Sequence, residues 1–189
     1  MITSFFKTLG KLHILLVFAC LTGFVFTGCA AKTLNHASLD AAQLKEEKIQ
    51  RVAVLLFESP LMDMQAGLHI SRLFELNLLN SGLYKIVDRG EVEKILGEKG
   101  MYPYPGIPSP KLRQLGDLLQ VDGVILGSVS QYGRFDLAFT ARLISVKSGM
   151  VLWSISQTGG GMFTPISEVA DNTVRSAVMD LKATLSPGK

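Results

Sequence analysis

The sequence has 189 residues, of which 48% are hydrophobic and 19% charged, and this length and composition indicate one folded domain of ordinary size. It carries 19 basic and 16 acidic residues, and two of the basic ones, Lys7 and Lys11, lie within the first 28 residues. Without those 28 residues, 17 basic residues face 16 acidic ones, so the charge gives no reason to expect nucleic acid or a polybasic membrane contact.

The first 28 residues have the organisation of an export signal. The two lysines precede an apolar run over residues 14–26, and the small residues Thr27 and Gly28 follow. The run has 13 positions, interrupted by Thr22 and Gly23, whereas a membrane-spanning helix needs about 20 apolar residues. We therefore predict that residues 1–28 are a cleaved signal peptide.

The cleavage site identifies a candidate for lipidation. Phe26-Thr27-Gly28-Cys29 resembles the lipobox of bacterial lipoproteins, with Phe26 where that motif usually carries Leu. Cys20 is a weaker candidate because choosing it leaves an apolar core of only about six residues. Cleavage before Cys29 leaves one cysteine in the mature chain, which excludes an internal disulfide. The sequence thus predicts attachment to a membrane through a lipid on Cys29.

Residues 29–50 are expected to form a lipidated tether. They are polar, have no sustained apolar stripe and include the charged cluster Lys45-Glu46-Glu47-Lys48. This composition predicts a solvated spacer that contains no more than a short helix.

A folded domain is predicted over residues 51–189. Residues 51–57 form a continuous apolar run, which is typical of a strand buried on both faces. Residues 66–80 carry apolar side chains at helical spacing, and Ser81-Gly82 ends that helix. The next expected elements are a strand at 84–88 and short helices at 91–97 and 111–119.

The second half of the domain changes to a strand pattern. Three β-type runs at 122–132, 135–146 and 150–157 are separated by short turn segments, which predicts an antiparallel meander. Residues 166–185 carry one apolar stripe and predict an amphipathic helix that covers a sheet face. The order β-α-β-α-α-β-β-β-α indicates an α/β fold of the α+β type, with a mixed sheet covered by helices.

The histidines suggest no catalytic centre. The mature chain holds His36 in the tether and His69 on the first helix, and we interpret His69 as a boundary residue rather than a base or metal ligand. A nucleophile also needs a positioned base and an orienting third group, and the sequence indicates neither. Loss of an envelope hydrolytic activity on mutation of His69 would support the enzyme alternative.

The acidic and glycine-rich segments also indicate no catalytic or phosphate-binding site. Glu91, Glu93 and Glu98 alternate with lysines and indicate a solvated helix face rather than paired catalytic carboxylates. Gly159-Gly160-Gly161 lacks the Lys-Ser/Thr of a phosphate-binding loop, and we interpret it as a flexible turn. The sequence therefore predicts a protein that is not an enzyme and has no cofactor and no metal site.

Two segments are candidates for partner binding. Tyr102 and Tyr104 lie in a proline-rich passage at 101–110, which is either a docking loop or a rigid crossover whose tyrosines pack on the domain. Met162 and Phe163 lie between the meander and the last helix, where they either insert into a neighbouring molecule or cover the domain's own core.

The order of these pieces resembles a known family. The segments that carry the resemblance are RVAVLLF at 51–57, NLLNSGLYKIVDRGEVEKILGEKG at 77–100, LGDLLQVDGVILGSVSQYG at 115–133 and ARLISVKSGMVLWSIS at 141–156. Together they resemble the curli-secretion lipoprotein family (CsgG-like) across most of residues 51–185. The same core is similar to the penicillin-binding-protein activator lipoproteins (LpoB-like) and to the N-terminal domain of TolB.

Recurrent motifs of the CsgG-like family fall on Val87-Asp88-Arg89, on Glu98 and on 121–129, and they look structural. The side chain of Asp88 is expected to accept hydrogen bonds from free amides at a helix start. Gly123 and Gly127 are expected to permit close approach within the sheet.

The sequence departs from the curli channel in one respect. Subunits of that channel add two transmembrane hairpins, which require four strands of about 9–11 residues each. The longest unassigned stretches of the domain, 58–65, 100–110 and 158–165, have no room for them. This departure from the curli channel therefore predicts a protein without its own pore.

Two functions remain open. One is an accessory or regulator that binds envelope proteins of a secretion or peptidoglycan-synthesis machine, with no nucleic acid as partner. The other is an oligomeric transport component of the outer membrane, built as a homo-oligomer related to the curli channel. Ala30 follows the lipidated cysteine, where an acidic residue would resemble the inner-membrane retention signal, so we expect the periplasmic face of the outer membrane.

Overall fold

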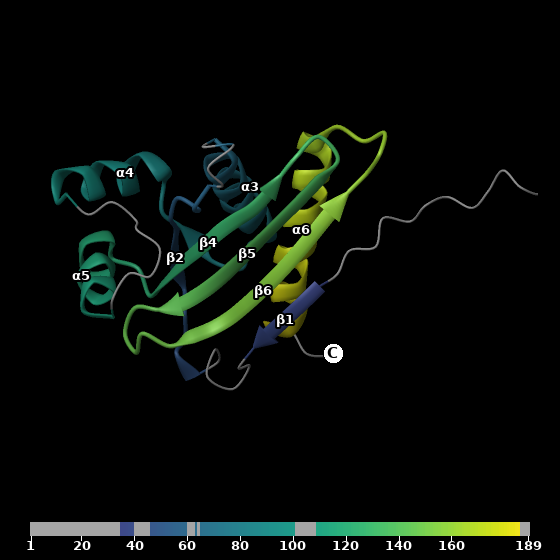
Figure 1. Ribbon diagram of the computed structural model, residues 1–189. Coiled ribbons are helices and arrows are strands. Elements are labelled where there is room, and N and C mark those ends of the chain that lie inside the picture. The colour runs from purple at the N-terminus through teal and green to yellow at the C-terminus, as the bar shows by residue number, and fades with distance from the viewer. Residues whose placement is uncertain (1–34, 40–45, 60–62, 64, 101–108, 186–189) are drawn as a thin grey trace, which may run out of the picture. The chain divides into compact units, whose positions relative to one another are not determined.

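One mixed sheet and four helices make up the part of the chain that the structure describes. The computed structural model describes residues 35–39, 46–59, 63, 65–100 and 109–185, all within the second of two units of the chain, Lys32–Lys189 (Figure 1). The elements are β1 (Asn35–Leu39), β2 (Arg51–Val54), α3 (Ala66–Ser81), β3 (Lys85–Ile86), α4 (Arg89–Glu98), α5 (Ser109–Leu119), β4 (Gly123–Tyr132), β5 (Asp136–Ser145), β6 (Val151–Gly160) and α6 (Ile166–Leu185).

The sheet has the spatial order β1-β6-β5-β4-β2-β3. Strand β2 is parallel to β3 and β4, whereas β4, β5, β6 and β1 are antiparallel neighbours. From β2 onward the element order is β-α-β-α-α-β-β-β-α. The predicted α/β class, the mixed sheet and the meander are therefore confirmed.

Local signals in the sequence set the helix ends. Gly82 has a φ of 67°, and its N–H donates to the carbonyl of Leu79 at 3.2 Å, which ends α3. Asp88 precedes α4, and its carboxylate accepts hydrogen bonds from the backbone N–H groups of Gly90 (2.8 Å) and Glu91 (3.4 Å). The predicted structural role of Asp88 is confirmed.

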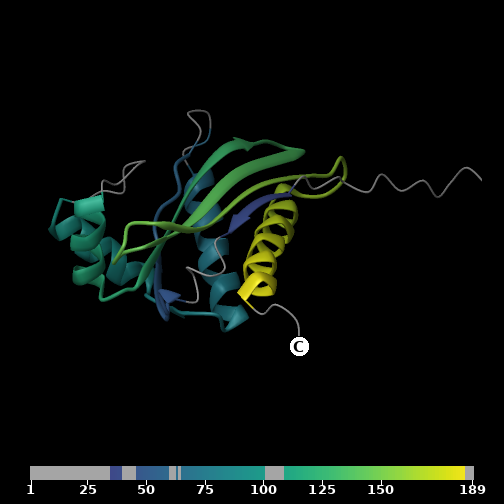
Figure 2. The same cartoon turned by 90° about the horizontal axis from the view of Figure 1, so that it is seen from below.

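The helices cover the two sheet faces unequally. Helices α3 and α6 lie side by side against one face, whereas α4 and α5 lie on the other side, next to β2 (Figures 1 and 2). Strand β2 and the residue after it show this division, since Val52 and Val54 join the core under α3 and α6 while Ala53 and Leu55 pack with α4 and α5. The predicted burial of this strand on both faces is confirmed.

Aromatic rings fill the larger core. The ring centroids of Phe57 and Phe74 are 5.2 Å apart, and those of Phe74 and Phe139 are 5.5 Å apart. Gly127 of β4 lies against the Phe57 ring, which a Cβ at that position would overlap. The predicted need for glycine is confirmed here, with an aromatic side chain as the close neighbour.

Residues 35–39 differ from the predicted solvated spacer. They form β1, which pairs antiparallel with β6 at the edge of the sheet, from Asn35 opposite Gln157 to Leu39 opposite Trp153. An edge strand can be added through backbone hydrogen bonds alone, so its side chains need not show an apolar pattern. The prediction of an unpaired spacer is wrong for these five residues.

The glycine-rich segment after the meander also differs from its prediction. Gly159 and Gly160 continue β6, opposite Leu137 and Asp136, so they do not form the expected flexible turn. A Cβ on Gly159 would overlap the hydroxyl oxygen of Thr173 in α6. Glycine is therefore needed where the helix packs closely on the strand.

Candidate functional site

Three exposed apolar side chains gather at one end of the meander. Phe135 lies in the turn between β4 and β5, and Met162 and Phe163 follow β6. Phe135 is 48% exposed, Met162 74% and Phe163 95%. We call these three residues the apolar tip. Because they are not folded onto the domain, the alternative in which Met162 and Phe163 cover the domain's own core is wrong.

Backbone hydrogen bonds hold the two segments of the apolar tip together. The N–H of Gly161 donates to the carbonyl of Phe135 at 2.9 Å, and Asp136 is paired with Gly160. The turn that contains Phe135 is closed by a hydrogen bond of 2.8 Å from the Gly133 N–H to the Asp136 carbonyl. The tip therefore consists of two adjacent turns of one sheet.

Two side chains of opposite charge, Arg134 and Asp136, flank Phe135 of the apolar tip. The guanidinium carbon of Arg134 lies 5.2 Å from the centroid of the Phe135 ring, within the range of a cation–π contact. Asp136 accepts a hydrogen bond of 2.5 Å from the side-chain amide of Gln131, and Glu168 lies exposed in the first turn of α6. The tip is thus apolar without being part of a basic patch.

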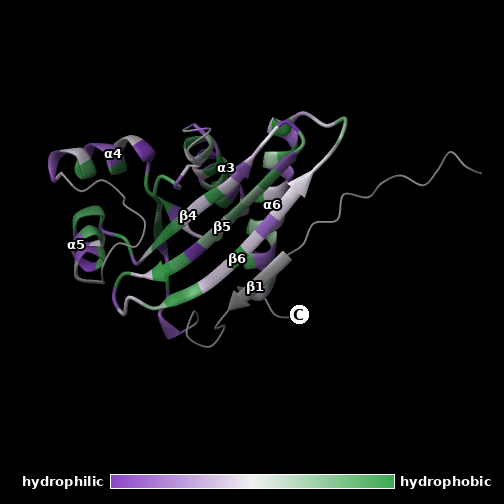
Figure 3. Cartoon of the chain, in the orientation of Figure 1, coloured by the Kyte–Doolittle hydropathy of each residue, from purple (hydrophilic) through white to green (hydrophobic). Residues whose placement is uncertain are grey.

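The outer side of the meander presents small polar side chains. Register places Ser128 opposite Thr140, Thr140 opposite Ser156 and Arg142 opposite Ser154. We call these five residues the open face. Each is exposed or half-buried, and Ser128 and Thr140 share a hydrogen bond of 2.9 Å. Much of β6 is drawn in the pale shades of intermediate hydropathy in Figure 3. The open face is therefore a polar surface that follows the strands of the meander, with Arg142 as its one charged residue.

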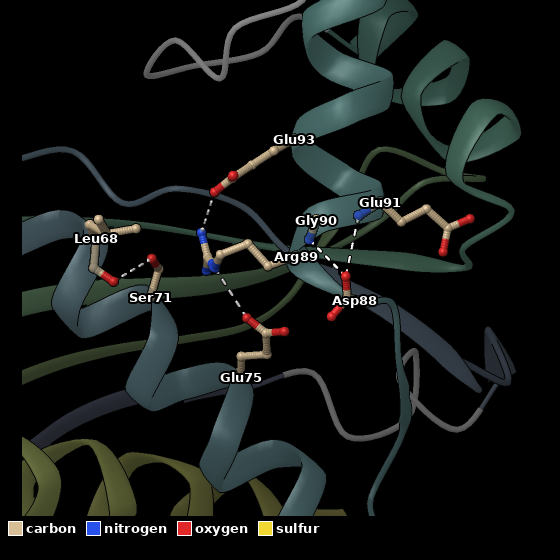
Figure 4. Close-up of polar contacts among 8 residues, drawn as sticks. All are labelled: Leu68, Ser71, Glu75, Asp88, Arg89, Gly90, Glu91 and Glu93. Carbon is tan, nitrogen blue, oxygen red and sulfur yellow. Dashed lines mark hydrogen bonds and ion pairs between the residues drawn. The ribbon is translucent and has the colours of Figure 1, made fainter.

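An arginine between α3 and α4 forms a charged cluster (Figure 4). The Nε atom of Arg89 lies 3.1 Å from Glu75, and one terminal nitrogen lies 3.7 Å from Glu93. The Arg89 side chain is 12% exposed, and its other terminal nitrogen has no hydrogen-bond partner among the described residues. The contact with Glu75 connects α4 to α3. Arg89, which belongs to the Val87-Asp88-Arg89 motif, therefore has a structural role.

His69 has a tyrosine as its polar partner. Its Nδ1 lies 2.5 Å from the hydroxyl oxygen of Tyr132, and the rings meet edge to face with centroids 5.8 Å apart. Burial, and then the negative charge of Asp63, raise the pKa of Tyr132 above its ordinary value. His69 itself is half-buried, as expected for a boundary residue. Within the described ranges, no three or more His, Cys, Asp or Glu side chains are grouped so that they could hold a metal ion.

A pocket that the sequence did not indicate lies near the start of β4. Its volume is about 480 Å³, and it is lined by Glu47, Ile49, Arg113, Asp117, Val121, Asp122, Val146 and Lys147. Two of its acids already have structural partners. Asp122 accepts from the backbone N–H groups of Gln50 (3.0 Å) and Arg51 (2.9 Å), and Glu47 accepts from the Ser145 hydroxyl at 2.9 Å. These carboxylates attach the segment before β2 to the sheet.

The structure locates some of the predicted site residues. Met162 and Phe163 lie together, and Phe135, which sequence reasoning missed, joins them. The sequence signal for Phe135 was an aromatic residue directly after Gly133-Arg134, within the hairpin turn. Cys29, Tyr102 and Tyr104 lie outside the described residues. Across the part of the chain with described structure, none of the helices is both long and apolar enough to cross a bilayer.

Comparison with known families supports the predicted resemblance. The model of the family described as curli production assembly/transport component CsgG matches residues 51–135. This match runs from β2 through the turn before β5. The CsgG-like resemblance is therefore confirmed for this part of the domain. No curated protein matches the sequence.

Solved structures share the fold. A PelC dodecamer from Paraburkholderia phytofirmans has a TM-score of 0.56 and 17% identity, over 78% of this chain and 96% of that one. The lipoprotein GNA1162 from Neisseria meningitidis has a TM-score of 0.56 and 24% identity, over 72% and 99%. E. coli LpoB has a TM-score of 0.50 and 13% identity, over 71% and 74%. The similarity to the LpoB-like core is confirmed at the level of the fold.

Proposed function

We propose that the protein is a lipid-anchored periplasmic assembly protein that acts by contact as an accessory of an envelope machine for secretion or peptidoglycan synthesis. It is attached through Cys29 to the periplasmic face of the outer membrane, and it has no catalytic activity of its own. The match to the curli assembly/transport family and the fold shared with a lipoprotein support this assignment.

The observation that carries the proposal is the open face. Helices cover the opposite side of the same strands, where Phe139, Ala141 and Ile155 are buried. On the open face, Thr140, Arg142 and Ser156 are exposed. The small side chains of Ser128, Thr140, Ser154 and Ser156 let a second surface approach the sheet closely, beside the exposed Arg142. Interfaces of non-obligate complexes are about as polar as the rest of a protein surface, so the composition of this face fits a partner that binds and leaves.

Site-specific photo-crosslinking tests this contact. A photoreactive amino acid at Ser156 in the full-length protein is expected to give a covalent product with an envelope protein in intact cells. The matched control carries the same group at Arg175, which is exposed on α6. Equal products from both positions, or none from Ser156, would contradict a contact through the open face.

The tyrosine segment is a second proposed contact for the same partner. Capture of the lipidated protein with its partners is repeated after Tyr102→Ala and Tyr104→Ala. We expect a reduced yield of the partner that the Ser156 crosslink identifies. An unchanged yield would remove these tyrosines from the proposal.

An oligomeric transport component is the alternative function. The PelC structure with the same fold is a dodecamer, which favours this alternative. A ring needs a heterologous interface, in which two different surfaces of each copy fit together. The sheet ends in two unlike strands, β1 and β3, so its two edges are different surfaces. The mass of the detergent-extracted mature protein separates the two functions, because a ring of many copies supports transport and a monomer or dimer supports the accessory role.

A further inference from the structure

The pairing of β1 gives the direction in which the chain leaves the domain. Strand β1 is antiparallel to β6, and its first residue, Asn35, lies opposite Gln157. Only two residues separate Gln157 from Gly160, the last residue of β6, after which Met162 and Phe163 of the apolar tip follow. The N-terminal end of β1 and the C-terminal end of β6 lie toward the same end of the sheet (Figure 1). The chain therefore enters the domain at the end that carries the tip.

The short connection from the anchor limits how far this end can lie from the membrane. Six residues lead from Cys29 to Asn35, and an extended chain spans at most about 3.3–3.6 Å per residue, so the reach is about 20 Å. With a lipid on Cys29, Asn35 lies no more than about 20 Å from the bilayer surface, so the end of the domain that carries Phe135, Met162 and Phe163 can reach that surface.

We propose that the apolar tip inserts into the surface of the bilayer to which Cys29 is anchored, as a second membrane contact of the protein. This inference rests on the proposed lipid anchor and assigns the tip a lipid surface as its partner. Moving phenylalanine and methionine side chains from water to the boundary of the acyl chains lowers the free energy. The three side chains project from two turns, so they can enter a lipid surface without a preformed cavity in a partner.

The surrounding charges decide which lipids matter. Arg134 and Asp136 place one positive and one negative charge on either side of Phe135. Because this balance is not positive, attraction to anionic headgroups does not drive the contact. The insertion is apolar, and it is expected in bilayers of zwitterionic phosphatidylcholine alone.

Tryptophan fluorescence of the lipidated full-length protein tests the inference. The chain has a single tryptophan, Trp153, which is fully buried. Phe163→Trp adds an indole at the tip, and the protein is reconstituted into phosphatidylcholine vesicles with brominated acyl chains. We expect a blue-shifted emission from the added indole and a loss of about half of that emission relative to unbrominated vesicles, since bromine in the acyl region quenches only an inserted indole.

Leu79→Trp is the matched control. Leu79 is 61% exposed near the end of α3, where the Ser81 carbonyl accepts a hydrogen bond from Lys182 of α6. Leu79 and Lys182 are near the C-terminal ends of α3 and α6, whereas the N-terminal end of α6 comes just after the tip. The indole at position 79 therefore lies away from the tip, and we expect no quenching there. In a variant that combines Phe163→Trp with Phe135→Ser and Met162→Ser, quenching is expected to fall about two-fold.

The outcomes separate the anchor from the tip. Flotation of the protein with vesicles, together with its mass, reports the lipid on Cys29. An unlipidated protein that does not float overturns the anchor and this inference with it. A protein that floats while its Phe163→Trp indole is not quenched leaves the anchor intact and overturns the insertion. A blue shift without quenching shows that another protein or a second copy covers the tip, and it also overturns the insertion.

Discussion

The two faces of the meander are built from the same strands and have opposite properties. Along β5, the residues Phe139, Ala141 and Leu143 are fully buried under α3 and α6, whereas Thr140 and Arg142 between them are exposed. Strand residues alternate between faces, so each strand contributes to a core and to a surface at the same time. The buried face of this sheet therefore stabilises the domain, whereas the exposed face can contact other molecules.

The largest expected effect follows from truncating the buried face. Phe139→Ala removes a ring that packs against Phe74, and it should lower the free energy of unfolding by about 4 kcal/mol. Thr140→Ala, one residue along the same strand on the open face, loses the hydrogen bond with Ser128 and should lower it by about 1 kcal/mol or less. Urea unfolding of both variants measures the difference. Equal losses would mean that the two faces are not distinguished as described.

A glycine substitution tests how tightly the buried face is packed. Gly127→Ala places a Cβ against the Phe57 ring and should cost about 2–3 kcal/mol of unfolding free energy. Gly97→Ala in α4 is the control, since no atom lies within 4 Å of the added carbon and the helix should gain about 0.5–1 kcal/mol. The same urea titration compares them, and a Gly127→Ala protein as stable as the parent would contradict the packing.

The buried side also predicts a loss of stability at high pH. Burial raises the pKa of Tyr84 from 10.0 to about 12, so the folded protein keeps a proton that the unfolded chain loses. This contribution is fully present below pH 10 and is lost as the pH rises toward 12, by about 2 kcal/mol.

Tyr84→Phe should remove that part of the pH dependence. At neutral pH the replacement should be nearly neutral, because the Tyr84 hydroxyl has no hydrogen-bond partner among the described residues. Unfolding free energies of the two proteins are compared across this pH range. The raised pKa of Tyr132 acts in the same direction but is common to both proteins, so it cancels in their difference. Parallel pH curves would contradict the prediction.

The smallest effect is expected at the start of α4, on the side of the sheet that only short helices cover. Asp88→Ala removes the acceptor of the Gly90 and Glu91 N–H groups and should cost about 1 kcal/mol. Glu91→Ala, an exposed change in the first turn of the same helix, should cost less than about 0.5 kcal/mol. Thermal unfolding resolves the order of the two, and the reverse order would show that the cap does not stabilise this helix.

Sequence by itself determined the features that depend on neighbours along the chain. The alternation in the meander, the glycine that ends α3 and the carboxylate of Asp88 that begins α4 all act within a few residues. The element order from β2 to α6 could be predicted for the same reason. Met162 and Phe163 could be singled out as candidates because they are apolar residues in a connecting segment.

Tertiary structure alone decided which distant segments meet. Strand β1 pairs with β6 across more than a hundred residues, and only this register sets the end at which the chain enters the domain. Phe135 reaches Gly161 because β5 pairs with β6, and Arg89 at the start of α4 meets Glu75 of α3 although the two helices pack in different cores. Such contacts depend on strand register and helix packing, which no local pattern specifies, because backbone hydrogen bonds and ion pairs form between many kinds of side chain.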